Sequence, residues 1–251
     1  MTEVVEKTSA PVAAAAAADS ALEVRALSKA FGTRKALDSL SFELPTGAFL
    51  AICGANGAGK TTLLRILATL ARPSSGSVSV LGCDIKEQPD EVRARIGFIS
   101  HRSMLYPDLT AEENLLLAAR LYGVVEPQTR VSELLAAVEL TARRYDLARS
   151  FSRGMTQRLA IARALIHDPQ LVLLDEPYTG LDPHASEIFD ALLATQRASR
   201  SFVLVSHDLR KGFELASHLL LLNRGKLELF APSAELDFAS FSQLYYQTVG
   251  G

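Results

Sequence analysis

The sequence has no tryptophan, only two cysteines and no long apolar run. Cys53 and Cys83 show neither a metal-binding spacing nor that of a redox pair, which suits a reducing cytoplasm and two buried structural thiols. No apolar stretch approaches the roughly 18 residues that a membrane-spanning helix needs, and "SHLLLLN" at 217–223 has only the length of a strand. If the protein works at a membrane, another subunit must supply the spanning part.

An excess of charge of either sign is also missing. Lysine and arginine number 26 against 28 acidic residues, and no basic block occurs. Nothing therefore marks the chain as a nucleic-acid-binding protein on grounds of charge. Its 251 residues allow one α/β domain, or a main domain with a small satellite, and either could bury a sizeable core.

The first twenty residues have little that would direct export or folding. Glu3 and Glu6 stand where a secretory signal needs positive charge, and the alanine run that follows is weakly apolar. We expect a disordered, alanine-rich tail over residues 1–20 and a single folded domain over 21–251.

Short β-type runs alternate with helical segments from residue 21 onward. Strands are expected at 22–27, 37–44 and 48–53, and a helix over 61–70. This alternation favours a largely parallel sheet with crossover helices. Residues 110–167 instead read as almost wholly helical, beginning with a capping box of Thr110 and Glu113, and predict a helical insert between two halves of the sheet.

The remaining part of the chain returns to alternation. We expect strands at 171–175 and 201–206, a helix from Pro183 and a hairpin over 219–230 that turns at Arg224-Gly225. No internal repeat is evident.

The stretch "GANGAGKT" fits the pattern G-x-x-x-x-G-K-[ST] between an expected strand and an expected helix. Backbone N–H groups of such a loop surround phosphate oxygens, Lys60 can reach the β- and γ-phosphates, and the Thr61 hydroxyl can bind Mg²⁺. The alternative is an ordinary glycine-rich strand-to-helix turn, but a chance match to this pattern arises in only on the order of one chain in a hundred of this length. The loop consists of Gly54, Ala55, Asn56, Gly57, Ala58, Gly59, Lys60 and Thr61.

Two carboxylates end the apolar strand in "LVLLDEPYTGLDP", residues 171–183. Asp175 can hold Mg²⁺, and Glu176 can accept a proton from an attacking water. Alone, this pair would be more typical of a solvated strand end, but beside a phosphate loop it predicts a Mg-nucleotide site. In "LVSHD", His207 follows another buried strand and could contact a γ-phosphate, although a lone histidine there would ordinarily carry no function.

Ser152 and Gly154 begin an expected helix in "FSRGMTQR". They could bind phosphate through a hydroxyl, a backbone N–H and the helix N-terminus. A simple helix cap explains the serine equally well.

Taken in order, these motifs resemble those of the nucleotide-binding subunits of ABC transporters, from residue 21 to the end. "GANGAGKTT", which adds Thr62, is similar to the Walker A motif, and "LVLLDE" to Walker B. "TGLD", with Asp182, resembles the D-loop, His207 the switch histidine and "FSRGMTQR" the signature sequence. Phe31 in "SKAFG" matches the aromatic residue that stacks on adenine.

The resemblance implies the P-loop NTPase fold of ABC ATPases: an α/β core with a largely parallel sheet, an antiparallel β part, and a helical subdomain over about 102–167. It also implies an ATP hydrolase using ATP and Mg²⁺ in a head-to-tail homodimer, or a heterodimer with a paralogue. Lys60 and Thr61 would bind nucleotide in their own copy, whereas Ser152 and Gly154 would complete the partner's site. Integral membrane permease subunits, with no nucleic acid, are the implied partners at the cytoplasmic side of the bacterial inner membrane.

Three positions depart from the family pattern. His101 in "IGFISHRSMLYPDLT" stands where the family usually carries the Q-loop glutamine, which senses Mg²⁺ and γ-phosphate. Imidazole titrates near neutral pH, so we expect weaker or pH-sensitive coupling, although a histidine satisfied by water at a loop edge remains an alternative. Arg153 and Met155 replace a glycine and a glutamine of the signature.

The histidine at position 101 and the short chain resemble one subgroup, the haem-exporter ATP-binding subunits of bacterial cytochrome c maturation. The alternative is the ATPase subunit of a drug, lipid or polysaccharide exporter.

A soluble ABC ATPase acting on DNA or ribosomes belongs to another class. The segment between His101 and Ser152 leaves no room for a long coiled coil, and neutral charge argues the same way. A P-loop GTPase or small-molecule kinase is a third possibility, but an Asn-Lys-x-Asp guanine motif is missing.

Overall fold

The computed structural model describes residues 20–100, 103–179, 181–197 and 199–250. His101, and the predicted tail apart from Ser20, lie outside the described residues. None of the helices within those ranges is long and apolar enough to cross a membrane.

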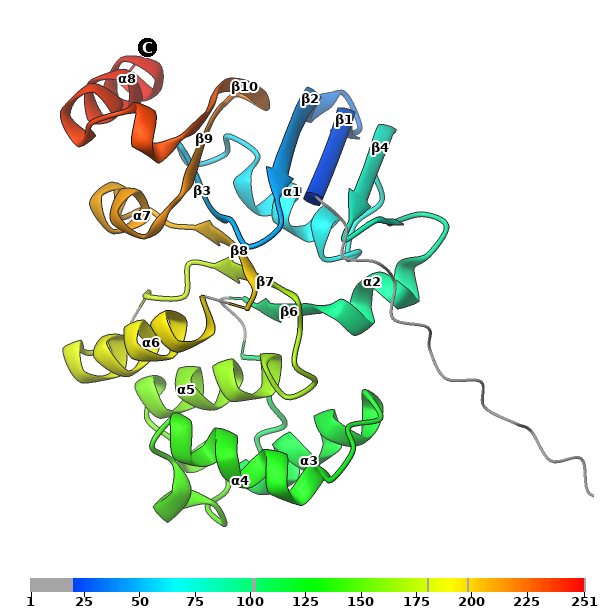
Figure 1. Ribbon diagram of the computed structural model, residues 1–251, viewed down its shortest axis with the longest axis vertical. Coiled ribbons are helices and arrows are strands. Elements are labelled where there is room, and N and C mark those ends of the chain that lie inside the picture. Colours follow the sequence, from blue (N-terminus) through cyan, green and yellow to red (C-terminus); the bar gives the residue numbers. More distant parts are fainter. Residues whose placement is uncertain (1–19, 101–102, 180, 198, 251) are drawn as a thin grey trace, which may run out of the picture.

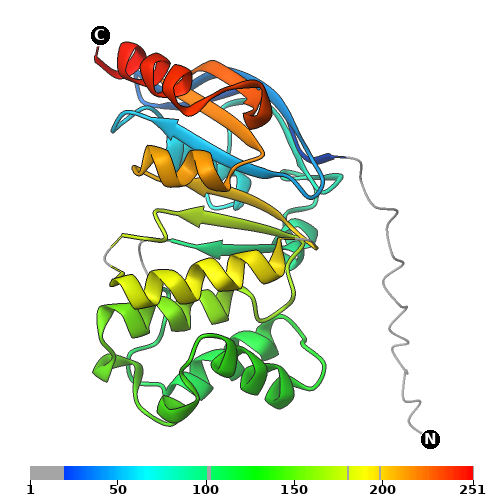
Figure 2. The same cartoon turned by 60° about the vertical axis from the view of Figure 1, so that its left-hand side comes forward.

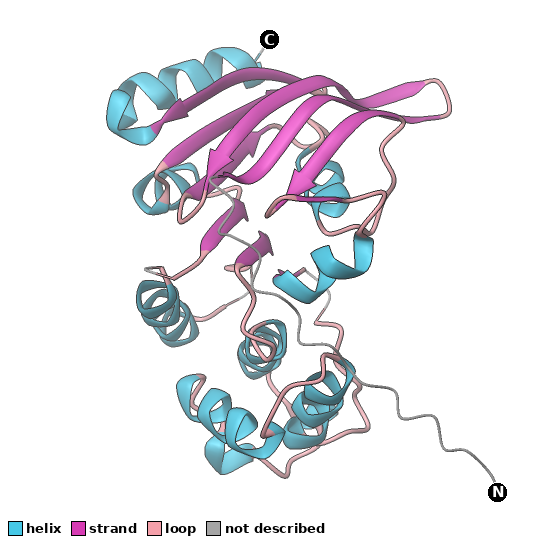
Figure 3. Cartoon of the chain, turned by 45° about the vertical axis from the view of Figure 1, so that its right-hand side comes forward, coloured by secondary structure: helices cyan, strands magenta, loops and turns pink. Residues whose placement is uncertain are grey.

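The strands form two sheets (Figures 1 and 3). The first is antiparallel, with the order β2-β1-β4-β5. The second has six strands in the order β10-β9-β3-β8-β7-β6, of which β10 alone runs antiparallel to its neighbour. The strands are β1 (Ser20–Phe31), β2 (Arg34–Pro45), β3 (Phe49–Gly54), β4 (Ser75–Val80), β5 (Cys83–Asp84), β6 (Ile96–Ile99), β7 (Leu171–Asp175), β8 (Ser201–Val205), β9 (His218–Asn223) and β10 (Lys226–Pro232).

The helices divide between the sheets and one end of the molecule. In Figures 1 and 2, α3, α4 and α5 gather at one end, and α8 lies at the opposite end. The helices are α1 (Lys60–Leu67), α2 (Pro89–Arg95), α3 (Ala111–Leu121), α4 (Pro127–Ala137), α5 (Arg153–Ala164), α6 (Pro183–Gln196), α7 (Leu209–Leu215) and α8 (Phe238–Gly250). Short 3₁₀ turns occur at Thr141–Arg143, Ala148–Ser150 and Ser233–Glu235.

Strand β3 separates two apolar cores. Side chains of a strand alternate between its faces, and here Leu50 and Ile52 join a cluster with α1 and the antiparallel sheet. Phe49 and Ala51 join the other cluster, which includes α3, α4 and α5. All residues of β3 are buried, as expected for a parallel strand covered on both faces. The phosphate loop therefore leaves the sheet from a strand that is buried along its whole length.

The mixed, mostly parallel sheet with its antiparallel β part is confirmed, and so are two local predictions. Thr110 Oγ1 accepts from Glu113 N at 3.1 Å and Glu113 Oε2 accepts from Thr110 N at 2.8 Å, which completes the capping box. The hairpin turns at Arg224 and Gly225, and both have positive φ, the conformation of a tight reversal. Strand β5 and helix α8 were not expected from the sequence.

Candidate nucleotide-binding site

The phosphate loop joins the end of β3 to the start of α1. Gly59, the N-cap residue of α1, has φ 110°, and a Cβ there would stand 2.5 Å from Ala36 O. Glycine is therefore required by both conformation and space. No side chain caps α1, so the loop leaves the N–H groups of the first helical turn available to an anion.

Lys60 points back into this loop. Its Nζ donates to Gly54 O at 2.6 Å and to Ala55 O at 2.9 Å. Burial lowers the pKa of Lys60 below its ordinary value, while the nearby Glu176 acts most strongly in the opposite direction. The partly desolvated ammonium group gains more from an added anion than an exposed one would.

Thr61 and Asp175 bring oxygen atoms of α1 and β7 together. Thr61 Oγ1 donates to Asp175 Oδ1 at 3.4 Å, and Asp175 is buried. A hydroxyl and a carboxylate are hard ligands that fit Mg²⁺. Within the described residues, no group of three or more His, Cys, Asp and Glu could hold a metal ion, so nucleotide oxygens and water would have to complete the coordination.

Glu176 adopts a left-handed conformation, with φ 53°, and its backbone N donates to Val205 O at 2.9 Å. Such an outlier persists only where its surroundings hold it. Its side-chain Oε2 lies 2.6 Å from His207 Nδ1 and accepts from His207 N at 3.2 Å. In this structure His207 thus contacts the predicted base, and its contact with a γ-phosphate stays a prediction.

A pocket of about 560 Å³ lies over the loop. Phe31 lies at this pocket and is 58% exposed, so part of its ring is accessible to an adenine base. Lys29 Nζ lies over the ring, 4.9 Å from its centroid. Arg34 and Ala36 of β2 also line it, and sequence reasoning missed both. The lining is Phe31, Arg34, Ala36, Asn56, Gly57, Gly59, Lys60, Thr61, Thr62, Glu176 and Val205.

The signature residues lie elsewhere. Ser152 is the N-cap of α5, and its Oγ accepts from Met155 N at 3.2 Å. Gly154 is buried where a Cβ would stand 3.1 Å from Asp182 Oδ2, and Asp182 itself caps α6 through Ala185 N. Neither Ser152 nor Gly154 is among the described residues that line the loop pocket.

Arg153 lies beside the loop that follows β7. Its Nη2 donates to Thr179 O at 3.4 Å, and with Glu176 it lines a smaller pocket of about 150 Å³. Eight of the predicted site residues line one pocket: Phe31, Asn56, Gly57, Gly59, Lys60, Thr61, Thr62 and Glu176. Asp175 and His207 do not line it but contact Thr61 and Glu176, which do. Gly54, Ala55, Ala58, Ser152, Gly154 and Asp182 are not among its lining residues.

Comparison with known proteins identifies the family. The family described as ABC transporter matches residues 37–179, more than half of the chain. The chain belongs to the ABC transporter family. It has the ABC ATPase fold and is an ABC-type ATPase with an ATP-binding cassette.

Two curated relatives are similar over most of this ABC ATPase. The Nod factor export ATP-binding protein I of Cupriavidus metallidurans is 36% identical over 208 residues, covering 82% of this chain and 69% of that protein. The daunorubicin resistance ATP-binding protein DrrA3 of Streptomyces coeruleorubidus is 35% identical over 213 residues, covering 84% and 67%. These names favour the general exporter alternative over the haem-exporter subgroup.

Two solved structures are similar in fold. The ATP-binding subunit of an ABC transporter has a TM-score of 0.83 at 30% identity, covering 90% of this chain and 98% of that one. A dimeric ATP-binding cassette in a post-hydrolysis state, bound to ADP and Pi, has a TM-score of 0.77 at 28% identity, covering 84% and 98%.

Proposed function

We propose that this ABC ATPase is the ATP-hydrolysing subunit of an exporter and powers separate membrane permease subunits. The observation that carries the proposal is the loop pocket, which brings Lys60, Thr61 and Glu176 together below an exposed Phe31. A phosphate-binding loop with a carboxylate at the same pocket supports hydrolysis of a nucleoside triphosphate.

Each residue has a defined task in this proposal. Lys60 and the N–H groups at the start of α1 bind the β- and γ-phosphates. Thr61 and Asp175 would hold Mg²⁺, which when bound neutralises charge on those phosphates. Glu176 accepts a proton from the attacking water, and His207 orients its carboxylate and can then turn to the γ-phosphate.

The active assembly is proposed to contain two copies, or this chain and a paralogue. Ser152 is exposed, and its hydroxyl can still donate to a phosphate while accepting from Met155 N. Because Ser152 and Gly154 do not line the pocket of their own chain, a second copy could present them to it. A dimeric state of the similar cassette bound to ADP and Pi supports this arrangement.

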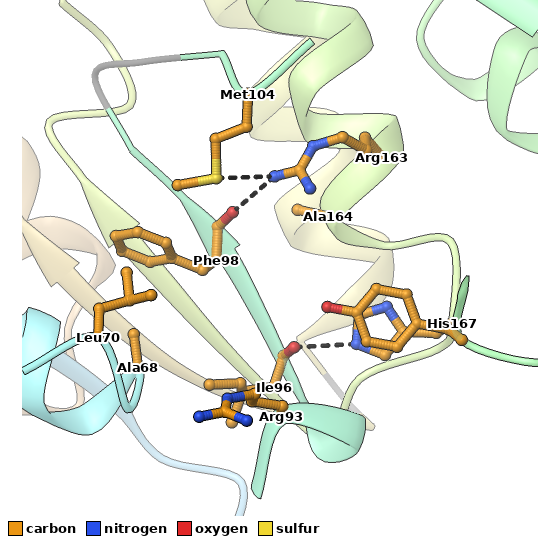
Figure 4. Close-up of a pocket in the computed structure, with 10 residues that line it drawn as sticks. Ala68, Leu70, Arg93, Ile96, Phe98, Met104, Arg163, Ala164 and His167 are labelled. Atoms are coloured by element: carbon orange, nitrogen blue, oxygen red, sulfur yellow. Dashed lines mark hydrogen bonds between the residues drawn. The ribbon is translucent and has the colours of Figure 1, made fainter. Parts of the chain in front are cut away.

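A groove between the sheet and the helical end offers a docking site for the permease (Figure 4). Leu70 and Met104 are 50% and 44% exposed there. Arg163 Nη2 contacts only neutral acceptors in Figure 4, Phe98 O at 3.4 Å and Met104 Sδ at 3.6 Å. No carboxylate pairs with Arg163 within the part of the chain that the structure describes, and its burial lowers the pKa of its guanidinium.

None of the described residues lining this groove is acidic, whereas Arg93 and Arg163 are basic. A partly buried, unpaired cation is costly unless a partner supplies an anion. We therefore infer that a cytoplasmic helix of the permease docks here with apolar side chains and a carboxylate that pairs with Arg163. This would place the chain at the cytoplasmic side of a bacterial inner membrane.

For the cargo, the names of the relatives support a drug, lipid or polysaccharide exporter. The haem-exporter hypothesis depends on the short chain and on His101, which lies outside the described residues.

Co-purification tests this function. A tagged Glu176→Gln form, expected to hold ATP and remain docked, is purified from detergent-solubilised native membranes and its partners are identified by mass spectrometry. We expect an exporter permease, and its loss when Arg163→Glu is added. Arg25→Glu, at an exposed position on β1, is the matched control and should retain the permease.

The other outcomes discriminate between the alternatives. Recovery of cytochrome c maturation membrane proteins would restore the haem reading. A membrane fraction without any partner, together with a salt-dependent gel shift on DNA or RNA, would favour a soluble ATPase.

A further inference from the structure

Two separate connections hold the loop after β7 to the start of α7. The first is the contact of Glu176 with His207. The second runs through α6: Tyr178 Oη donates to Asp190 Oδ1 at 2.7 Å, and Lys211 Nζ donates to Asp190 Oδ2 at 2.5 Å. Tyr178 follows Glu176 by two positions and Lys211 follows His207 by four, so both connections join the same two segments.

The second connection is held in place by packing. The Tyr178 ring meets the Phe189 ring edge-on, with centroids 5.1 Å apart, and Lys211 Nζ lies 5.2 Å from the Tyr178 centroid. Burial and then the bond to Asp190 raise the pKa of Tyr178 well above its ordinary value, so its hydroxyl stays protonated and donates.

The connection also reaches the residue next to His207. Asp208 Oδ1 accepts from Lys211 N at 2.9 Å and so caps the short helix α7. Lys211 therefore contacts both the start of its own helix and Asp190 of α6. A shift of Tyr178 or of Asp190 would be transmitted to the position of His207.

In the proposed function the first connection opens during hydrolysis. To orient a water, Glu176 has to release His207 Nδ1, and to reach a γ-phosphate His207 has to leave Glu176. The left-handed backbone of Glu176 needs support from its surroundings throughout. The second connection involves neither group and can persist through this exchange.

We propose that Tyr178, Asp190 and Lys211 form a positioning clamp that keeps Glu176 and His207 in register during hydrolysis. The proposal rests on the roles of Glu176 and His207 in the proposed function. The three clamp residues touch no nucleotide in this account and act only through the two residues that they position. Losing the clamp should lower kcat and leave nucleotide binding at the phosphate loop unchanged.

Tyr178→Phe is the sharpest test, because it removes one oxygen and keeps the ring packing. We expect kcat for ATP hydrolysis to fall about 10-fold with KM changed less than about 2-fold, since small misplacements at a reacting centre cost rate. Ser233→Ala is the matched control: it removes a half-buried hydrogen bond, Ser233 Oγ to Ala216 O at 2.6 Å, and should leave kcat unchanged.

The clamp should also behave as a unit. Lys211→Met should lower kcat as much as Tyr178→Phe, the double variant should add little, and Lys211→Arg should recover most of the rate. The proposal would be overturned if Tyr178→Phe left kcat unchanged, or if it lowered kcat/KM only by raising KM. Additive effects on kcat in the double variant would also overturn it. Undiminished kcat in Glu176→Gln would instead overturn the role of Glu176 and, with it, what the clamp positions.

Discussion

The starts of α1 and α5 are built in opposite ways, although both carry residues predicted to bind phosphate. Helix α1 begins after Gly59 with no side-chain cap, and Lys60 is folded into the loop. Helix α5 begins after Ser152, whose Oγ already accepts from Met155 N. The start of α1 therefore has free N–H groups that can bind an anion within its own chain. At the start of α5 the serine already caps the helix, and only its hydroxyl proton can be donated to a second molecule.

The largest effect on the ATPase rate should come from a substitution at the start of α1. Lys60→Met removes the charge inside the loop and should lower the ATPase rate by about 100- to 1,000-fold, the usual cost of losing a group that stabilises the transition state. Steady-state phosphate release measures this, with Lys226→Met on the exposed edge of β10 as the control. A loss below about 3-fold, smaller than that usual cost, would contradict the role of Lys60.

Two substitutions at the start of α5 separate the two roles of Ser152, as a helix cap and as a phosphate ligand. Aspartate is as good an N-cap as serine, so Ser152→Asp should keep the stability of α5, but its negative charge would repel the partner's γ-phosphate. We expect the ATPase rate to fall about 100-fold, as for a lost transition-state donor, with nucleotide affinity of the single chain unchanged. Ser152→Ala should instead lower stability by about 1 kcal/mol, as measured by urea unfolding.

If Ser152→Asp hydrolysed ATP at the parent rate, Ser152 would be a cap and nothing more. The comparison between the two helix starts would then carry no functional meaning.

His167, just beyond the far end of α5, should make the stability of the folded chain depend weakly on pH. His167 Nε2 lies 2.9 Å from Ile96 O, and its ring stacks on Tyr122 with centroids 3.8 Å apart. Burial lowers the pKa of His167, the hydrogen bond to Ile96 O opposes this shift, and repulsion from Arg163 and Arg200 adds to it. His167 therefore binds a proton less readily in the folded chain than in the unfolded chain. The unfolded chain takes up a proton near pH 6.5, so it binds more protons below that pH and stability falls as pH falls.

Urea midpoints measured between pH 7 and pH 5 test this, and His167→Gln should flatten the decline. An equal decline in the variant would assign the effect to other groups.

The smallest expected effect concerns the reactivity of the Cys53 thiol. Cys53 is a buried residue of β3 and directly precedes the phosphate loop. Burial raises the pKa of the Cys53 thiol to about 12, so almost no thiolate exists at pH 8. Iodoacetamide should label Cys53 only after unfolding, as followed by mass spectrometry of peptides. Rapid labelling of the native protein would contradict this and show that β3, the strand before the loop, opens.

The sequence predicts what local spacing determines. The loop glycines, Lys60, Thr61, Asp175 and Glu176 belong to contiguous stretches with strand and helix context, and the capping box at Thr110 is likewise local. Arg34 reaches the pocket through the pairing of β1 and β2, where Phe31 lies opposite Arg34 across the two-residue turn Gly32-Thr33. That short turn is a local signal for a hairpin, which the sequence analysis did not use. The Tyr178, Asp190 and Lys211 clamp draws on three segments, so only tertiary structure brings it together.

Ser152 illustrates a different limit. The sequence offered a helix cap and a phosphate ligand as alternatives, and the structure shows the cap. One hydroxyl can do both, so the second role depends on a molecule beyond this chain.

The most direct test of the central claim is the mass of Glu176→Gln in solution with Mg-ATP, measured by light scattering during size exclusion. The account predicts a nucleotide-dependent dimer of twice 27.1 kDa, which Ser152→Asp in the same background abolishes although each chain still binds ATP. A Glu176→Gln chain that holds ATP and stays monomeric, or a dimer unaffected by Ser152→Asp, would contradict a site completed by α5 of a second copy.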